Sequence, residues 1–132
     1  MNSETKYCRS CYNHLAGYVG VSLTEALENK GILKRQNTGY DITESGLKFF
    51  NSLGISVQAP DKSNNRPLTR QCIDGSERRP HLAGKLGDAL LHLLFEKKWV
   101  KRLGESRAIV PTDKGEREFF LPLGVPLRVT VD

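Results

Sequence analysis

The chain has 132 residues, enough for one domain or for two small halves that share a core. Its composition, 38% hydrophobic and 27% charged, is ordinary for a globular protein and excludes wholesale disorder. No apolar run is long enough to cross a bilayer, and the first residues lack the pattern of a secretory signal. Three cysteines are an odd number, which suits free or metal-bound thiols in a reducing compartment better than a disulfide scaffold. We therefore expect a cytoplasmic protein with no membrane partner.

An internal repeat dominates the sequence. The tetrapeptide His-Leu-Ala-Gly occurs at residues 14–17 and again at 81–84, and further matches follow at a constant offset. Later matches, such as 43–46 with 112–115, have a slightly larger offset, which we attribute to a longer loop in the second copy. Such self-similarity predicts two copies of one supersecondary unit. We expect a first repeat at 1–58, a connector at 59–70 and a second repeat at 71–132.

Each repeat is expected to form a helix, a β-hairpin and a second helix. Apolar residues recur every three or four positions from His14 to Lys30 and from about His81 to Lys98, which is typical of helices that face a core. Turn-forming clusters at 37–39 and 104–106 predict hairpins over 32–43 and 99–110. Thr43 is a good N-cap for a helix that ends near Leu53, and a last helix should begin near Thr112. The predicted fold class is α+β, mainly α.

Two glycines recur near the start of the first helix of each repeat. Gly17 and Gly20 return as Gly84 and Gly87, although each costs a helix about 1 kcal/mol relative to alanine. We expect another backbone or a ligand to approach closely at these positions. The alternative is a helix that is kinked or begins late.

The predicted order resembles part of a winged helix. Residues 27–33 and 40–46 are similar to the recognition helix, the wing and the following helix of bacterial winged-helix regulators. The flanking segments 11–17 and 72–84 resemble the C-terminal region of a subgroup of ArsR-type transcriptional regulators, and the resemblance extends from Cys11 to Val125. In that subgroup a DNA-binding winged helix precedes this region, and the 132 residues do not contain it. The resemblance implies a dimerising or effector-sensing module of a regulator, and we expect a homodimer.

Cysteine and histidine have metal-compatible spacing in the first repeat, Cys8-x-x-Cys11-x-x-His14, and the pair Cys72 and His81 stands at the equivalent place in the second. If the repeats pack pseudo-symmetrically, four of these side chains converge into a site that suits Zn²⁺ or another thiophilic ion. The predicted ligands are Cys11, His14, Cys72 and His81, with Asp74 and Glu77 able to add oxygen ligands or to orient an imidazole. Alternatively, each histidine caps a helix or bonds a backbone carbonyl, and the cysteines are small buried apolar groups.

The segment before the second repeated helix is rich in hydrogen-bonding groups. It places paired arginines next to a helix start, where an anionic small-molecule effector could bind. The candidate effector-binding residues are Asp74, Glu77, Arg78 and Arg79. The alternative, which we weight equally, is an internal Glu–Arg network that braces the joint between the repeats.

DNA is a second candidate partner, since the net charge is +5. The outward residues of the first repeated helix include two carboxylates, so the predicted wings are better suited to phosphate contact. Their basic residues are Lys34, Arg35, Lys101, Arg102 and Arg107.

Effector sensing and dimerisation is the leading hypothesis, and the alternatives are a DNA-binding protein without sequence specificity and a small metal-binding interaction module. We expect no enzyme, because the Cys–His pairs lack any recognisable catalytic signature.

Overall fold

The computed structural model describes residues 2–57 and 66–132, so most of the predicted connector at 59–70 lies outside the described residues. The elements follow in this order: α1 (Ser3–Tyr7), β1 (Arg9–Cys11), β2 (His14–Ala16), α2 (Gly17–Asn29), β3 (Leu33–Gln36), β4 (Gly39–Ile42), α3 (Glu44–Ser52), β5 (Arg70–Ile73), β6 (Pro80–Ala83), α4 (Gly84–Glu96), β7 (Val100–Arg102), β8 (Ile109–Pro111), α5 (Asp113–Gly115), a π-helical turn (Glu116–Phe120) and α6 (Leu121–Leu123).

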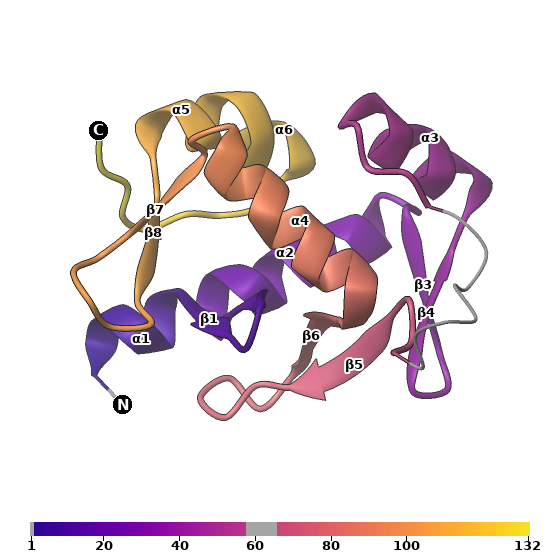
Figure 1. The fold of residues 1–132 in the computed structure, drawn as a ribbon, viewed down its shortest axis with the longest axis horizontal. Helices are drawn as coiled ribbons and strands as arrows, with labels where there is room; N and C mark the ends of the chain where they lie inside the picture. The colour runs from indigo at the N-terminus through magenta and orange to yellow at the C-terminus, as the bar shows by residue number, and fades with distance from the viewer. Residues whose placement is uncertain (1, 58–65) are drawn as a thin grey trace.

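After α1 the order of hairpin, helix, hairpin and helix occurs twice (Figure 1). Each pair of strands, β1–β2, β3–β4, β5–β6 and β7–β8, is an antiparallel sheet of two strands. The chain is therefore α+β, as expected, and the two predicted hairpins are present as β3–β4 and β7–β8. The winged-helix character of the repeated unit stays a prediction.

The predicted start of the first helix in each repeat was wrong. Residues 14–16 form strand β2 and residues 81–83 lie in β6, so a hairpin precedes each helix. The helices begin at Gly17 and Gly84, whose φ angles of +77° and +85° favour glycine. Backbone also approaches closely, because a Cβ at Gly17 would lie 2.8 Å from the Lys6 carbonyl oxygen. The helix thus begins late because these glycines make a sharp turn against neighbouring backbone.

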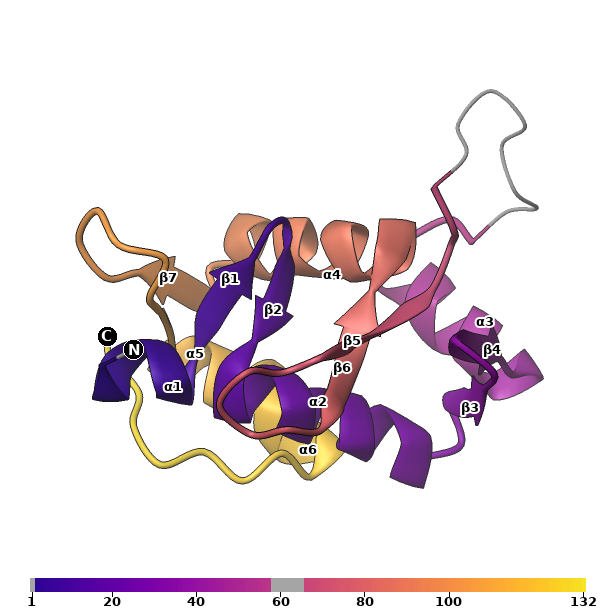
Figure 2. The same ribbon diagram turned by 90° about the horizontal axis from the view of Figure 1, so that it is seen from below.

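The two repeats interlock around one hydrophobic core. Helix α2 packs against β6 of the second repeat, α4 packs against β2 of the first, and β2 contacts β6. In Figure 1 α4 crosses over α2, and in Figure 2 β2 and β6 lie between the two helices. The buried core cluster draws on both repeats, from Leu15 and Leu27 to Leu86 and Leu94. Because the leading hairpin of each repeat packs on the first helix of the other repeat, a change in the packing of one repeat alters the packing of the other.

The last helical segment, from Thr112 to Gly124, is one residue longer than its counterpart from Thr43 to Gly54. Thr43 and Thr112 each accept a hydrogen bond from the N–H of a glycine three residues later, which fixes both helix starts. The π-helical turn at Glu116–Phe120 then inserts one extra residue before α6. This turn brings the fully buried Phe120 to the place that Phe50 holds in α3. The growing offset of the repeat therefore has two sources, the longer loops and this turn.

Replacement of Thr43 by alanine should lower the free energy of unfolding by about 1 kcal/mol, because the N–H of Gly46 loses its cap. Urea denaturation would measure the change. The control is Ser45→Ala in the same turn, where the side chain is exposed and the change should stay within about 0.5 kcal/mol. Equal effects of the two substitutions would contradict the assignment of Thr43 as the cap.

Within the described ranges, every helix is too short or too polar to cross a membrane.

Candidate functional site at the junction of the repeats

Each leading hairpin carries one cysteine directly opposite one histidine. In the β1–β2 register Cys11 pairs with His14, and in the β5–β6 register Cys72 pairs with His81. Directly opposite residues of an antiparallel pair lie on the same face of the sheet. Within the first pair the cysteine and the histidine are separated by the tight turn at 12–13, and within the second by the longer loop at 74–79. The strand registers nevertheless give both repeats the same arrangement.

The two pairs meet at the contact between β2 and β6. The Nε2 atoms of His14 and His81 lie 3.0 Å apart, and the ring centroids are 4.9 Å apart. One ring nitrogen of each histidine and the Sγ atoms of Cys11 and Cys72 all lie within 4.8 Å of one another. The structure thus brings together the four predicted ligands, which we call the Cys/His cluster. Cys8, the third cysteine of the sequence pattern, lies in the hydrophobic core instead, and metal binding by the cluster stays a prediction.

Burial shapes the chemistry of the cluster. The two imidazoles are 2% and 1% exposed, whereas Cys11 and Cys72 are only half-buried. Burial lowers the pKa of His14. Burial and the neighbouring His14 ring also lower the pKa of His81, to about 4. Burial and then the adjacent Cys11 thiol raise the pKa of Cys72. Neutral imidazoles with available lone pairs therefore face two thiols that solvent can reach.

Asp74 follows β5 and links the β5–β6 hairpin to the first repeat through hydrogen bonds. Its Oδ1 accepts hydrogen bonds from Arg9 and from the Gly17 N–H, both at 2.8 Å. Its Oδ2 accepts from Ser76 and from the N–H of Glu77. Burial alone would raise the pKa of Asp74, but these hydrogen bonds and the Arg9 charge outweigh it and hold the pKa at about 2. The carboxylate is thus charged, buried and fully engaged in the structure.

The same carboxylate also reaches the Cys/His cluster. Its Oδ1 lies 3.8 Å from Nδ1 of His81, and this nitrogen is buried without a hydrogen-bond partner among the described residues. A carboxylate on that side favours the tautomer with the proton on Nδ1, which leaves Nε2 of His81 as an acceptor facing His14. Asp74 thus lies near the cluster without a hydrogen bond to His81, and its role as an oxygen ligand or as an orienter of an imidazole stays a prediction.

Two of the other predicted effector-binding residues, Glu77 and Arg79, form an ion-pair network with Glu25 of the first repeat. Arg79 makes two hydrogen bonds to the carboxylate of Glu25, at 2.9 and 3.0 Å, and one to Glu77 at 3.3 Å. Arg78 is exposed and has a φ of +58°. This arrangement matches the alternative of an ion-pair network between the repeats. Anion binding at Asp74, Glu77, Arg78 and Arg79 stays a prediction.

The basic residues of the predicted wings do not share one surface. Strands β3–β4 and β7–β8 lie at opposite ends of the molecule in both views (Figures 1 and 2). Arg35 pairs with Glu28, Lys101 bonds the carbonyl of Asp132, and Arg102 packs over the Phe95 ring. Lys34 and Arg107 are exposed. DNA contact by these residues stays a prediction.

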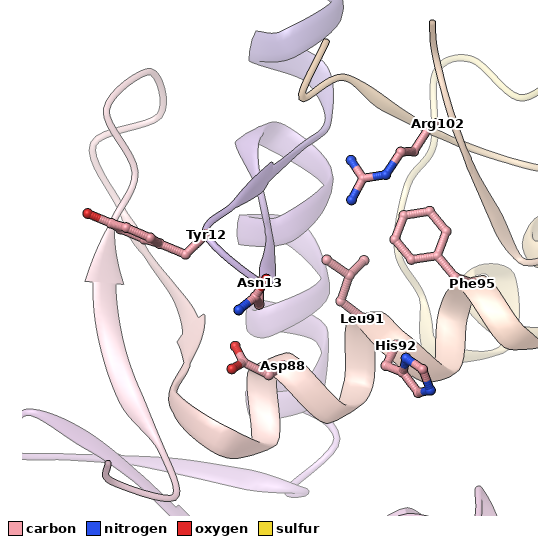
Figure 3. A pocket seen from close by; sticks show the side chains of 7 residues that line it. All are labelled: Tyr12, Asn13, Asp88, Leu91, His92, Phe95 and Arg102. Atoms are coloured by element: carbon pink, nitrogen blue, oxygen red, sulfur yellow. The ribbon is translucent and has the colours of Figure 1, made fainter. Parts of the chain in front are cut away.

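A pocket of about 350 Å³ opens beside the turn of the first hairpin. Figure 3 shows Asn13 and Asp88 facing each other there, with Phe95 and Arg102 at the far side. Its volume lies near the lower end of small-molecule sites. The residues that line this pocket do not include the four of the Cys/His cluster; a neighbouring pocket of about 380 Å³, which also contains Tyr12 and Asn13, has His14 in its lining.

Sequence reasoning missed Arg9 and Thr24. Arg9 is 4% exposed in a segment without a readable pattern, and its role depends on Asp74 from the other repeat. Thr24 lies on the apolar face of α2 and accepts a hydrogen bond from the Leu82 N–H. The periodicity of the sequence placed Thr24 off the apolar stripe of the helix, so no sequence signal marked it, and no local pattern marks Arg9.

Native protein should react with an alkylating reagent at Cys11 and Cys72 but not at Cys8. Cys8 is fully buried, and burial also raises the pKa of its thiol, so little thiolate is present. Peptide mass spectrometry after labelling would locate the adducts, with urea-unfolded protein as the control in which all three cysteines react. Rapid labelling of Cys8 in native protein would contradict its position in the core.

The fold and site define an α+β protein of two interlocked repeats with a Cys/His cluster at their junction. Over 124 residues the chain is 40% identical to a protein of Bacillus subtilis (strain 168) named "Uncharacterized HTH-type transcriptional regulator YdfF". The match covers 94% of this chain and 54% of that protein, so the chain spans about half the length of its relative. This similarity supports a relationship to transcriptional regulators. No protein-family model matches the chain, and no solved structure matches it.

Proposed function

We propose that the chain is the effector-sensing and dimerisation module of an ArsR-like bacterial transcriptional regulator. Similarity to a protein named as a regulator, over 94% of this chain, supports the regulatory role. Because the match covers only 54% of that protein, we assign DNA reading to a part of such a regulator outside the matched region.

The burial of α2 is the observation that carries the sensing role. In the resemblance to winged-helix regulators this helix holds the place of the recognition helix, which must present an exposed face to the major groove. Nine of its 13 residues are buried. The partly exposed Glu25 and Glu28 would repel phosphate, and both already pair with arginines. A helix that is buried against the hairpin of the other repeat is suited to transmitting a signal and not to reading bases.

The junction is a suitable point of entry for that signal. A ligand at the Cys/His cluster would contact β2 and β6 together, and each strand packs on the central helix of the other repeat. Binding would therefore favour one relative arrangement of the repeats over others, which is the requirement for a ligand to shift a conformational equilibrium.

Two measurements test the proposal. The chain would be fused behind the DNA-binding domain of a phage repressor that represses only as a dimer, and repression of a reporter gene would be measured. We expect repression to be restored, and sedimentation of the unfused chain to give a dimer. A monomeric chain with an inactive fusion would contradict the dimerisation role.

Fluorescence anisotropy of the unfused chain with duplex DNA tests the alternative. We expect no sequence-specific binding. Binding that is indifferent to sequence and strengthens steeply as salt is lowered would instead favour a nucleic-acid-binding protein that uses the wings.

A further inference from the structure

We propose that the Cys/His cluster is a tetrahedral Zn²⁺ site that joins the two repeats, with Cys11, His14, Cys72 and His81 as its four ligands. The proposal deepens the proposed function, since the ion would be the effector of the module. The site itself stands on the geometry of the junction and does not require a regulatory role.

The separations of the ligand atoms fit such an ion. Zinc binds imidazole nitrogen at about 2.0–2.1 Å and thiolate sulfur at about 2.3 Å, so in a tetrahedral site ligand atoms lie about 3.3–3.8 Å apart. Here the two Nε2 atoms are 3.0 Å apart and all four ligand atoms lie within 4.8 Å of one another. An ion would need to move the side chains by only about 1 Å, with the two imidazole rings separating slightly.

The kinds of ligand select a thiophilic ion. Two thiolates and two imidazoles suit Zn²⁺, whereas Mg²⁺ and Ca²⁺ prefer oxygen ligands. The carboxylate beside His81, that of Asp74, already accepts hydrogen bonds from Arg9, Gly17, Ser76 and Glu77. It lies 3.8 Å from the unpartnered Nδ1 of His81, which is the place of the outer carboxylate that commonly orients a zinc-bound imidazole.

The strand registers explain why both repeats supply the same pair. Each leading hairpin holds a cysteine opposite a histidine, and the contact of β2 with β6 sets the two pairs face to face. The half-buried cysteines lie on the side that solvent reaches, so an ion can enter without unfolding of the core. Neither repeat alone supplies more than two ligands, so binding would require the junction to be formed.

The test uses the whole chain, purified, freed of metal with a chelator and kept reduced. Zn²⁺ would be titrated in competition with a chromophoric chelator, and Co²⁺ would be added as a spectroscopic probe. We expect one Zn²⁺ per chain, together with the intense ligand-field bands of tetrahedral Co²⁺ and thiolate-to-cobalt charge transfer. Absence of Zn²⁺ binding, or a Co²⁺ spectrum without thiolate charge transfer, would overturn the proposal.

Variants locate the site. Cys11→Ser and Cys72→Ser change half-buried side chains, so the fold should persist, as circular dichroism would verify. Each should weaken Zn²⁺ binding more than about 100-fold, since loss of an outer partner alone costs about 10–100-fold. The matched controls are Cys8→Ala, in the core, and His92→Gln, at an exposed histidine that pairs with Glu96; both should bind Zn²⁺ like the parent. Unchanged binding in the two serine variants, or its loss in His92→Gln, would refute the site.

The failure of the site and the failure of the proposed function are distinguishable. If the parent binds Zn²⁺ but repression by the fusion does not change when Zn²⁺ is added or chelated, the ion is structural and its role as effector is refuted while the site stands. If the fusion represses and dimerises but the chain binds no Zn²⁺, the module stands and the metal site is refuted.

Discussion

Substitution of Asp74 by alanine should lower the free energy of unfolding by about 3–5 kcal/mol, the cost of leaving a buried charge without its partner. The Asp74 side chain is fully buried, and Arg9, which donates to it at 2.8 Å, is only 5% exposed. The substitution would also remove the acceptor of the N–H groups of Gly17 and Glu77. Because Arg9 and Gly17 belong to the first repeat, the loss should loosen the junction as well as the hairpin.

Urea denaturation of the variant and the parent would measure this effect. Asp41→Ala, at an exposed position of β4, serves as the control and should change stability by less than about 0.5 kcal/mol. Asp74→Asn keeps the shape but turns an amide NH₂ toward hydrogen-bond donors, so it should also destabilise the protein. A loss below about 1 kcal/mol in Asp74→Ala would mean that the network does not hold the repeats together.

Phe50→Ala and Phe120→Ala should each destabilise the protein by about 3–5 kcal/mol, the usual range for truncation of a buried phenylalanine. Both side chains are fully buried, and each makes an edge-to-face contact with the preceding phenylalanine, with ring centroids 5.2 and 5.1 Å apart. The two residues occupy equivalent places in the repeats once the π-helical turn is counted. Since the repeats share one core, each loss should appear in a single unfolding transition.

Thermal and urea unfolding of both variants would provide the measurement. Leu121→Ala is the control, because Leu121 follows Phe120 directly and is 66% exposed. It should leave stability nearly unchanged. If Phe120→Ala unfolded the second repeat in a separate transition while the first remained folded, the shared core would not be the unit of stability.

Periodic patterns were sufficient for the longer elements. The central helices α2 and α4, the hairpins β3–β4 and β7–β8, and the cap at Thr43 were all predictable because their signals are local. The leading hairpins were not. His14–Ala16 and His81–Ala83 continue the apolar spacing of the helices that follow, and strands of three or four residues are too short to show an alternation of their own.

The candidate site was predictable in part. Cys11, His14, Cys72 and His81 were singled out by their spacing and by their place in the repeat, on the condition that the repeats pack pseudo-symmetrically. Their separation in the fold depends on strand register and on the contact of β2 with β6, which no local spacing encodes. Arg79 shows the limit of such reasoning, because its partner Glu25 lies in the other repeat.

The sequence by itself determined the duplication, the α+β class and the residue types available at the junction, because repeats, periodicity and composition are properties of the chain alone. Only the tertiary structure decided that each hairpin packs on the helix of the other repeat, that Asp74 and Arg9 are buried together, and that two histidines meet at 3.0 Å. These outcomes depend on contacts between residues more than 50 positions apart, whose free energies are realised only when both repeats close around one core.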